Sequence, residues 1–337
     1  MNAPSDVLAP VGASLRDLLR VAPAGAPVDL AAIDPRSTPG LPGVELTGVD
    51  RKDWARAQVR LIGAELAQQQ EMLFASAKVA GAVPADATVD GSGAVGRGGA
   101  TGAGGGTGAG DGGGAARRVL LVLQAMDCGG KDGTIKRVAG AMNPLGLHIR
   151  SFGPPTAEEL RHDFLWRIER ALPPAGYVGV FNRSHYEDVL IARVDGLIEE
   201  ATWRARYDRI NAFERDLADE GVAVVKVMLH ISHAEQGTRL LERLTDPRKH
   251  WKYQPADVDA RARWAEYQAA YAEALTRCGT DAAPWYVVPA DRKWYRDWAV
   301  AHLLRETFAG LRLGYPPAGF DVAAERERLL RELGRAR

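Results

Sequence analysis

The chain is poor in cysteine, in net charge and in long apolar runs. Its 337 residues include only two cysteines, Cys128 and Cys278, which excludes a disulfide framework and suits a reducing cytoplasm. Lysine and arginine number 43, as do aspartate and glutamate, so any phosphate affinity must come from local clusters. No apolar run reaches the roughly 18 residues that span a bilayer, and no signal pattern opens the sequence. We therefore expect a cytoplasmic protein without a membrane partner.

Composition divides the chain into five parts. Residues 1–50 are rich in Ala, Pro and Asp and predict an extended N-terminal arm, and residues 51–80 carry the apolar stripe of a helix. Residues 91–114 contain 14 glycines in 24 positions and bury too little apolar surface to offset their ordering entropy. We therefore expect a disordered glycine-rich insertion over 88–115. The remaining parts are a core over 116–315 and a C-terminal tail or helix over 316–337.

Strand-like and helix-like segments alternate from residue 118 onward. The apolar strand candidates are 118–124, 148–152, 177–182, 222–231 and 285–289. Helical periodicity fills 132–142, 156–171, 184–220 in pieces, 233–244, 256–277 and 292–312. This alternation predicts an α/β fold in which a parallel sheet of about five strands is sandwiched by helices. Because ligands bind beyond the carboxyl ends of such strands, the loops after Leu123, Phe181 and Ile231 should line one cleft.

The strand candidate at 118–124 leads through Asp127-Cys128-Gly129-Gly130-Lys131 into a helix, which is the layout of a phosphate-binding loop (P-loop). Glycines let backbone N–H groups approach a phosphate, and the lysine reaches the outer phosphoryl oxygens. Asp127 is a carboxylate in a loop that binds anions, which predicts a Mg²⁺ ion between the two negative groups. The match to the pattern G-x-x-x-x-G-K-[ST] is partial, because Ala125 stands at the first glycine of the pattern and Asp132 stands at its Ser/Thr. A plain strand-to-helix turn is the alternative.

A second polar motif, 182–188, follows the strand candidate at 177–182 and reads Asn-Arg-Ser-His-Tyr-Glu-Asp. Its side chains should lie where the sheet opens to the cleft. Arg183 can hold a phosphate through its planar fork, and Glu187 or Asp188 can bind Mg²⁺ or orient an acceptor. Asn182 is a poor metal ligand, so the better candidates are Asp127, Asp132 and Asp188. The alternative is a helix N-cap at Ser184 with an exposed first turn.

A basic cluster over 239–252 mixes cations with aromatic side chains. Arg239 and Arg243 are four residues apart and share one helix face. The loop that follows contains Arg248, Lys249, His250, Trp251 and Lys252. We interpret the cluster as a mobile cationic lid over a polyanion, at about 236–256. A solvated helix face and a site for single-stranded nucleic acid are the alternatives.

As a set, these motifs resemble the polyphosphate kinase 2 family. The matching segments run in order through 123–127, 130–136, 181–189, Asp246-Pro247 with Lys249 and Trp251-Lys252, and 284–293. The arm around 33–40 is also similar, whereas the glycine-rich insertion departs from the family. The resemblance implies a P-loop kinase fold with a helical lid, and a Mg²⁺-dependent, reversible phosphoryl transfer between inorganic polyphosphate and nucleotides. The Ser-His-Tyr-Glu-Asp form at 184–188 is similar to the branch that accepts both AMP and ADP.

The resemblance also implies roles for the residues at matching positions. Catalysis would depend on Asp127, Lys131, Arg183 and Asp188, and the metal, Mg²⁺ or alternatively Mn²⁺, would be bound by Asp127 and Asp188. Phosphate and polyphosphate would be bound by Gly129, Gly130, Asp132, Gly133, Thr134, Lys136, Arg137, Arg239, Arg243, Lys249 and Lys252. Of these, Arg239 and Arg243 would line the polyphosphate channel. The nucleotide would contact Asn182, His185 and Glu187, and a homodimer or homotetramer is implied.

The nucleophile would be a terminal phosphate oxygen of AMP or ADP, or of GMP or GDP, which is already anionic at neutral pH. Two other functions fit the same motifs. One is an ATP-dependent nucleoside or nucleotide kinase. The other is a nucleic-acid-binding protein on a P-loop scaffold. Because Asp127 and Asp188 would repel nucleic acid, we do not expect nucleic acid to be the partner. The sequence leaves open the acceptor preference, the base specificity, the direction, the oligomeric state and the role of the insertion.

Overall fold

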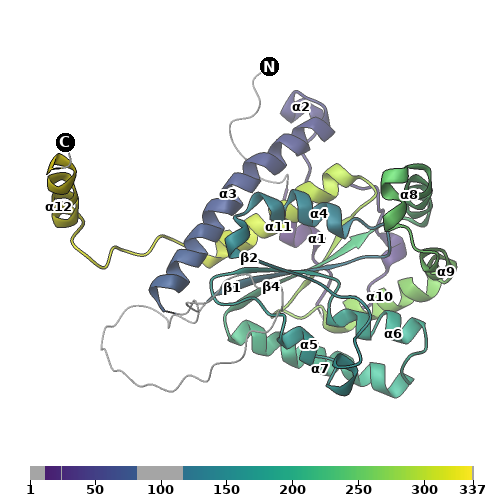
Figure 1. Cartoon of the computed structure of the whole chain (residues 1–337). Coiled ribbons are helices and arrows are strands. Elements are labelled where there is room, and N and C mark those ends of the chain that lie inside the picture. The colour runs from purple at the N-terminus through teal and green to yellow at the C-terminus, as the bar shows by residue number, and fades with distance from the viewer. Residues whose placement is uncertain (1–11, 24, 82–116, 336–337) are drawn as a thin grey trace.

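The computed structural model describes residues 12–23, 25–81 and 117–335 (Figure 1). The glycine-rich insertion expected over 88–115 lies outside the described residues. One sheet contains the strands β1 Arg118–Gln124, β2 Leu147–Ser151, β3 Val178–Asn182, β4 Val222–His230 and β5 Trp285–Pro289. All neighbouring pairs are parallel, in the order β2-β3-β1-β4-β5. The predicted five-stranded parallel sheet of an α/β fold is confirmed.

The register of the central strands determines where the site forms. Leu123 of β1 lies opposite Asn182 of β3 and Val227 of β4. The strands β1 and β3 therefore end at the same level of the sheet. Because both run in the same direction, the loops that follow them begin side by side, at the edge where parallel α/β sheets bind ligands.

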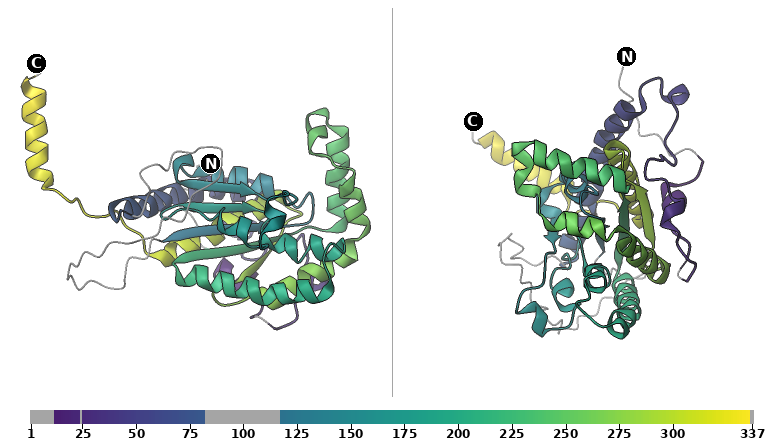
Figure 2. Two further views of the ribbon diagram at one scale, coloured as in Figure 1. Left: turned by 60° about the horizontal axis from the view of Figure 1, so that its bottom comes forward. Right: turned by 90° about the vertical axis from the view of Figure 1, so that its right-hand side faces the viewer.

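Helices cover both faces of the sheet (Figures 1 and 2). On one face, α3 (Arg51–Val79), α11 (Lys293–Leu311) and α1 (Leu15–Leu19) bury a cluster that includes Trp54, Leu121 and Trp298. On the other face, α5 (Trp166–Glu169), α6 (Ile191–Val194), α7 (Glu200–Asp219) and α10 (Trp264–Cys278) cover two further clusters. Leu120 and Val122 belong to the second face, as the two-residue period of a strand requires.

Several helices are shorter than their sequence patterns predict. The helix expected over 132–142 is α4 (Lys131–Arg137) with a 3₁₀ turn after it, and that expected over 156–171 is reduced to α5 and a 3₁₀ turn. Before α5, the side chain of Asp163 accepts the N–H of Leu165 at 3.1 Å, a local bond that competes with helix formation. The segment 184–220 divides into a 3₁₀ helix His185–Asp188, α6 and α7. The segment 256–277 divides into α9 (Ala256–Ala262) and α10.

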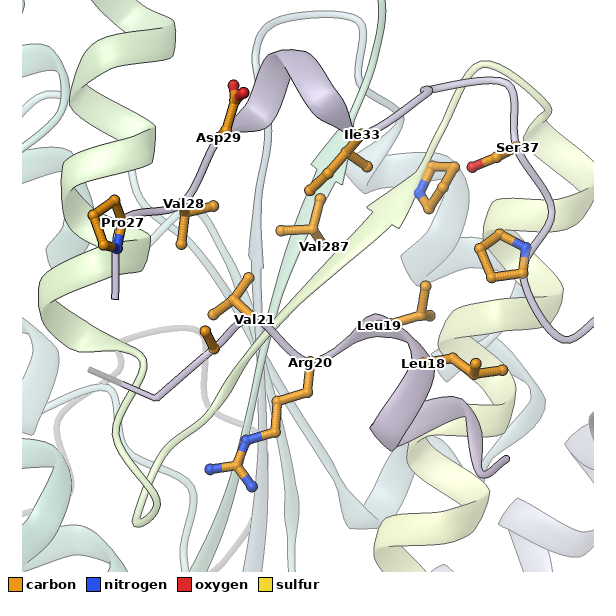
Figure 3. Close-up of a pocket in the computed structure, with 13 residues that line it drawn as sticks. Leu18, Leu19, Arg20, Val21, Pro27, Val28, Asp29, Ile33, Ser37 and Val287 are labelled. Carbon is orange, nitrogen blue, oxygen red and sulfur yellow. The ribbon is translucent and has the colours of Figure 1, made fainter. Parts of the chain in front are cut away.

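The N-terminal arm packs along the edge of the sheet and includes α1, α2 (Val44–Thr47) and a 3₁₀ turn Leu30–Ala32. Arg20 forms an antiparallel bridge with Tyr286, and the N–H of Val21 donates to the carbonyl of Trp285 at 3.0 Å. An apolar pocket of about 240 Å³ lies between the arm and β5, where Val21 faces Val287 (Figure 3). None of the residues predicted for catalysis or binding lines this pocket.

The C-terminal helix α12 (Val322–Arg335) stands apart from the body in Figure 1 and in the left-hand view of Figure 2, and the side chains of residues 322–334 are exposed. Among the described residues, no helix combines the length and the apolar character that crossing a membrane requires.

His302 of α11 is a histidine inside the apolar core. Its ring packs against Trp298, with centroids 4.6 Å apart, and neither ring nitrogen has a hydrogen-bond partner in the described part of the chain. Burial lowers the pKa of His302 to about 3, from an ordinary value of 6.5. The unfolded chain therefore binds one more proton than the folded chain between these two values. This group contributes stability that is present above pH 6.5 and is lost as pH falls towards 3.

We expect His302→Leu to remove this acid sensitivity, because leucine fills a similar volume and binds no proton. The unfolding free energy of the variant minus that of the wild type should rise by about 1.4 kcal/mol per pH unit below pH 6.5, and should stay constant above it. Urea unfolding from about pH 5 to pH 8 measures both regions. A difference that does not change with pH would contradict the prediction.

Candidate active site

The loop that joins β1 to α4 turns through two glycines that have no room for a side chain. A Cβ on Gly129 would lie 2.4 Å from the Cβ of Ala125, and one on Gly130 would lie 1.7 Å from Nη1 of Arg296. Gly130 has a φ of +106°, and Cys128 has a φ of +62° in the left-handed region. The P-loop turn therefore requires glycine at both positions, as its sequence predicts.

Lys131 is the first residue of α4, and its side chain is buried and turned back over the loop. Its Nζ donates to the carbonyl oxygen of Ala125 at 3.0 Å. Burial lowers the pKa of Lys131 and Arg183 lowers it further, while Asp127 and Glu187 act in the opposite direction. Asp132 acts in the same direction more weakly, so the ammonium group interacts with one other cation and with three carboxylates.

Arg183 connects two of those carboxylates. It follows β3 directly, has a φ of +65°, and its N–H donates to the carbonyl of Leu123 at 3.0 Å. Its Nη2 donates to Oδ1 of Asp127 at 3.1 Å, and its Nη1 lies 3.8 Å from Oε2 of Glu187. Burial alone would lower the pKa of Arg183, but the two carboxylates outweigh it and raise the pKa. Lys131, Arg183, Asp127 and Glu187 are hereafter called the ionic cluster.

The ionic cluster forms the polar wall of a cleft. Asp127, Arg183 and Glu187 line it together with the mainly apolar side chains of Ala125, Met126, Leu190, Ile191, Ala260, Tyr267 and Tyr271. Burial raises the pKa of Glu187, and Arg183 and Lys131 oppose that effect. The cleft therefore combines a charged end beside the P-loop with an apolar end beside α6 and α10.

The lid consists of α8 (His233–Thr245), a 3₁₀ helix Pro247–Lys252 and α9, which lie together at one end of the molecule (Figures 1 and 2). Nη1 of Arg243 donates to the carbonyl of Lys252 and to Oδ2 of Asp257, both at 2.9 Å. Nζ of Lys252 lies 3.8 Å from Oδ2 of Asp132, whose Oδ1 accepts from Asn182 at 2.9 Å. The lid therefore reaches the start of α4, where Asp132 also contacts Asn182, the last residue of β3.

Of the four lid cations predicted to bind polyphosphate, two remain accessible, Arg243 is about one-fifth exposed, and one is buried. Lys249 and Lys252 have side chains that are about two-fifths exposed. Arg239 is buried, and its guanidinium donates to the carbonyls of Cys128, Ala290 and Asp291 and to Glu235. The expectation that Arg239 lines a polyphosphate channel is therefore corrected: backbone carbonyls satisfy this arginine inside the protein.

The expected nucleotide contact of His185 is also corrected. Ser184 caps the 3₁₀ helix by accepting the N–H of Tyr186, and this turn directs His185 into the core. Nε2 of His185 lies 3.2 Å from Oε1 of Glu214, and the ring is only 1% exposed. A buried side chain in this position contacts α7 and not the cleft.

Asp188 does not join Asp127 in a metal site. Its Oδ1 accepts from Arg206 at 3.0 Å, and its Oδ2 lies 3.5 Å from Nη2 of Arg167. Burial raises the pKa of Asp188, while these two arginines oppose the effect. Asp188 is therefore paired with two arginines away from the P-loop, whereas Asp127 shares Arg183 with Glu187.

The remaining predicted phosphate ligands lie on α4, and the structure adds two residues behind them. Oγ1 of Thr134 and Nη1 of Arg137 both contact Asp297 of α11, at 3.4 and 3.1 Å. Gly133 would place a Cβ 3.1 Å from Arg296, and Lys136 is exposed. The sequence prediction missed the buried pair Arg296–Asp297. The sequence shows this pair only as two adjacent opposite charges next to the apolar run 298–301 of α11.

Comparisons with known proteins agree with this geometry. The sequence profile of the polyphosphate kinase 2 family matches residues 114–311. The AMP/ADP-polyphosphate phosphotransferase of Meiothermus ruber is 51% identical over 199 residues, which are 59% of this chain and 74% of that protein. The ADP-polyphosphate phosphotransferase of Rhodopseudomonas palustris is 43% identical over 224 residues, which are 63% of this chain and 76% of that protein.

A solved structure extends the similarity to the whole fold. The crystal structure of polyphosphate kinase 2 from Arthrobacter aurescens TC1 superposes with a TM-score of 0.80 at 43% identity, covering 96% of this chain and 100% of that one. The matched profile includes the P-loop, the 182–188 motif and the lid. The chain belongs to the polyphosphate kinase 2 family.

Proposed function

We propose that this protein transfers phosphoryl groups reversibly from inorganic polyphosphate to AMP and ADP, with GMP and GDP as further acceptors. The observation that carries the proposal is the ionic cluster, which joins the P-loop lysine to Arg183 and two carboxylates at the carboxyl ends of β1 and β3. The relatives named as AMP/ADP- and ADP-polyphosphate phosphotransferases support the same donor and acceptors.

Phosphoryl transfer requires little covalent chemistry from the side chains of the protein. The acceptor's terminal phosphate oxygen is already an anion, so no strong base is needed, and the transition state spreads its charge over the equatorial oxygens of the transferred group. Lys131 and Arg183 neutralise that charge, and the cluster aligns donor with acceptor. The lid carries further cations, and its closure would exclude water, which competes as an acceptor.

A divalent cation, Mg²⁺ or alternatively Mn²⁺, fits this site. The Asp127 carboxylate is 27% exposed and shares Arg183 with Glu187, so both carboxylates are available beside the P-loop. The described residues contain no group of three or more metal-binding side chains, so substrate phosphates and water would complete the shell, as is usual for Mg²⁺. When bound, the ion supplies additional charge neutralisation at the phosphates.

We assign the nucleotide base to the apolar end of the cleft. Leu190, Ile191 and Tyr267 offer apolar and aromatic surface next to the ionic cluster. An acceptor that lies along the cleft then directs its phosphates towards Lys131 and Arg183. A cytoplasmic location and a homodimeric or homotetrameric state stay predictions.

The test is a donor assay. The protein is incubated with Mg²⁺, polyphosphate and either AMP or ADP, without ATP, and the nucleotides are separated by chromatography. We expect ADP and then ATP from AMP, and ATP from ADP. Products formed only when ATP is the donor would indicate a nucleotide kinase instead. Salt-sensitive binding of single-stranded nucleic acid with no transfer would indicate the nucleic-acid-binding alternative.

Asp127→Asn should lower the maximal rate about 100-fold and raise the Mg²⁺ concentration for half-maximal rate about tenfold, because an amide is a weaker ligand and a weaker partner for Arg183. A Mg²⁺ titration of the transfer rate measures both quantities. Asp219→Asn, an exposed position at the end of α7, is the matched control. An unchanged Mg²⁺ dependence would remove Asp127 from the metal site.

A further inference from the structure

Every backbone carbonyl of the P-loop segment 125–129 has a hydrogen-bond partner. The N–H of Gly129 donates to the carbonyl of Met126 at 3.0 Å, and side chains supply the others. These are Lys131 to Ala125 at 3.0 Å, Gln236 to Asp127 at 3.1 Å, Arg239 to Cys128 at 2.9 Å, and Arg296 to Gly129 at 3.5 Å. The loop is thus fixed from behind by residues of α4, α8 and α11.

Fixing a carbonyl also fixes the N–H group of the same peptide plane. The peptide unit is planar and trans, so its C=O and N–H point in opposite directions. The N–H of Cys128 shares a plane with the carbonyl of Asp127, and the N–H of Gly130 shares one with the carbonyl of Gly129, so holding these carbonyls directs both N–H groups to the other side, where they can form an anion-binding concavity. The N–H of Gly129, in the plane of the Cys128 carbonyl, donates instead to the carbonyl of Met126 and closes the turn. The side chains behind the loop therefore determine how well its backbone can bind phosphate.

Two of these side chains come from the lid helix. Gln236 and Arg239 are one turn apart on α8, and they are 0% and 5% exposed. Oε1 of Gln236 also accepts from Arg261 of α9 at 3.1 Å, so this carboxamide joins both helices of the lid to the P-loop. Neither side chain lines the cleft, so neither contacts substrate from this position.

We propose that Gln236 and Arg239 are positioning residues that couple the lid to the P-loop by holding the carbonyls of Asp127 and Cys128. The inference rests on the proposed function of the loop as a phosphate site. A lid movement that shifts α8 changes the orientation of these two peptide planes, and with it the Asp127 side chain that the first of them carries. Lid position and phosphate affinity are therefore linked through two buried side chains.

The first test is Gln236→Glu. The carboxylate keeps the shape of glutamine and still accepts from Arg261, but it has no N–H to donate to the carbonyl of Asp127. We expect kcat with polyphosphate and AMP to fall about tenfold or more, and Kd for tripolyphosphate, measured by calorimetry, to rise about tenfold. The melting temperature of the variant is measured alongside, because a positioning role predicts lost tripolyphosphate affinity in a protein that keeps its wild-type stability, whereas a general loss of packing lowers both.

Thr238→Ala is the matched control on the same helix, since Thr238 is exposed and its hydroxyl bonds only to the carbonyl of Ala234 within α8. Arg239→Lys is the second variant, and it decides the question if Gln236→Glu fails to fold. Lysine keeps the charge but lacks the fork that spans three carbonyls, so we expect at least a fivefold loss of kcat, in the range of about 5- to 50-fold.

Wild-type kcat and Kd in both variants would overturn the inference, as would a loss of tripolyphosphate affinity only in step with a lowered melting temperature. A wild-type protein that binds tripolyphosphate but transfers no phosphoryl group would contradict the proposed function instead. In that case the Kd values of the variants still decide whether these residues position the loop.

Discussion

Replacing Lys131 with alanine should lower kcat for transfer from polyphosphate to AMP by about 100- to 1,000-fold, which is roughly 3–4 kcal/mol of transition-state stabilisation. Lys131 is buried beside Asp127 and Glu187, where its charge acts through a medium of low polarity. Alanine removes the cation and also the donor that holds the Ala125 carbonyl. Initial rates with saturating AMP measure the loss.

Lys78→Ala is the control. Lys78 is an exposed lysine in the last turn of α3, so replacing it removes the same charge at a position far along the chain from the P-loop. Melting temperatures of both variants show whether the fold persists. If Lys131→Ala keeps its fold and turns over at the wild-type rate, the assignment of this loop to phosphate binding is wrong. A loss confined to KM would mean that Lys131 binds the ground state and the transition state equally.

The sequence could predict those parts of the site that are local along the chain. The P-loop is a strand, a glycine turn and a helix that follow one another directly between Arg118 and Arg137, and each step has its own signature in residue type. Arg183 directly follows a buried strand, so its place at the carboxyl edge of the sheet follows from the strand alone. The same argument predicted the sheet, because β1, β3, β4 and β5 are mainly apolar and buried, while β2 is a more polar strand at its edge.

The choice between neighbouring acidic residues could not be predicted in this way. Glu187 and Asp188 are adjacent, and which of them faces the cleft depends on the helix type and on its starting angle. A 3₁₀ helix turns by about 120° per residue, so Glu187 points to Arg183 while Asp188 points to Arg206. The N-cap at Ser184, considered as an alternative to a functional motif, is present together with the functional residues.

Contacts between distant segments were also beyond sequence reasoning. Arg239 was interpreted as a free lid cation because, apart from Glu235, its partners are backbone carbonyls more than 50 residues away, and a backbone carbonyl does not depend on residue type. Arg296 and Asp297 lie within a helix whose buried residues are mostly apolar, yet they pack beneath Gly130 and α4. Only the folded arrangement of α8 and α11 against the P-loop identifies these residues.

A buried ionic group behind the 182–188 motif connects that motif to the core. Lys226 of β4 is fully buried, and its Nζ donates to Oε2 of Glu214 at 2.5 Å, to the hydroxyl of Tyr186 at 2.7 Å and to the carbonyl of Cys278 at 2.7 Å. Oε1 of Glu214 accepts from Tyr186 at 2.9 Å. Burial alone would raise the pKa of Glu214, but Lys226 and then His185 outweigh it and lower the pKa.

Lys226→Met should therefore lower the unfolding free energy by about 3–5 kcal/mol, because it leaves the Glu214 carboxylate buried without its cation. The double variant Lys226→Met with Glu214→Met should recover more than half of that loss, since apolar pairs of similar volume replace buried ion pairs at little cost. Urea unfolding of the wild type, both single variants and the double variant completes the thermodynamic cycle. Additive losses would mean that the two side chains do not interact. Tyr186 directly precedes Glu187, so the single variant Lys226→Met should also lose transfer activity under conditions in which it remains folded. A stable and fully active Lys226→Met protein would show that this buried ionic group does not support the site.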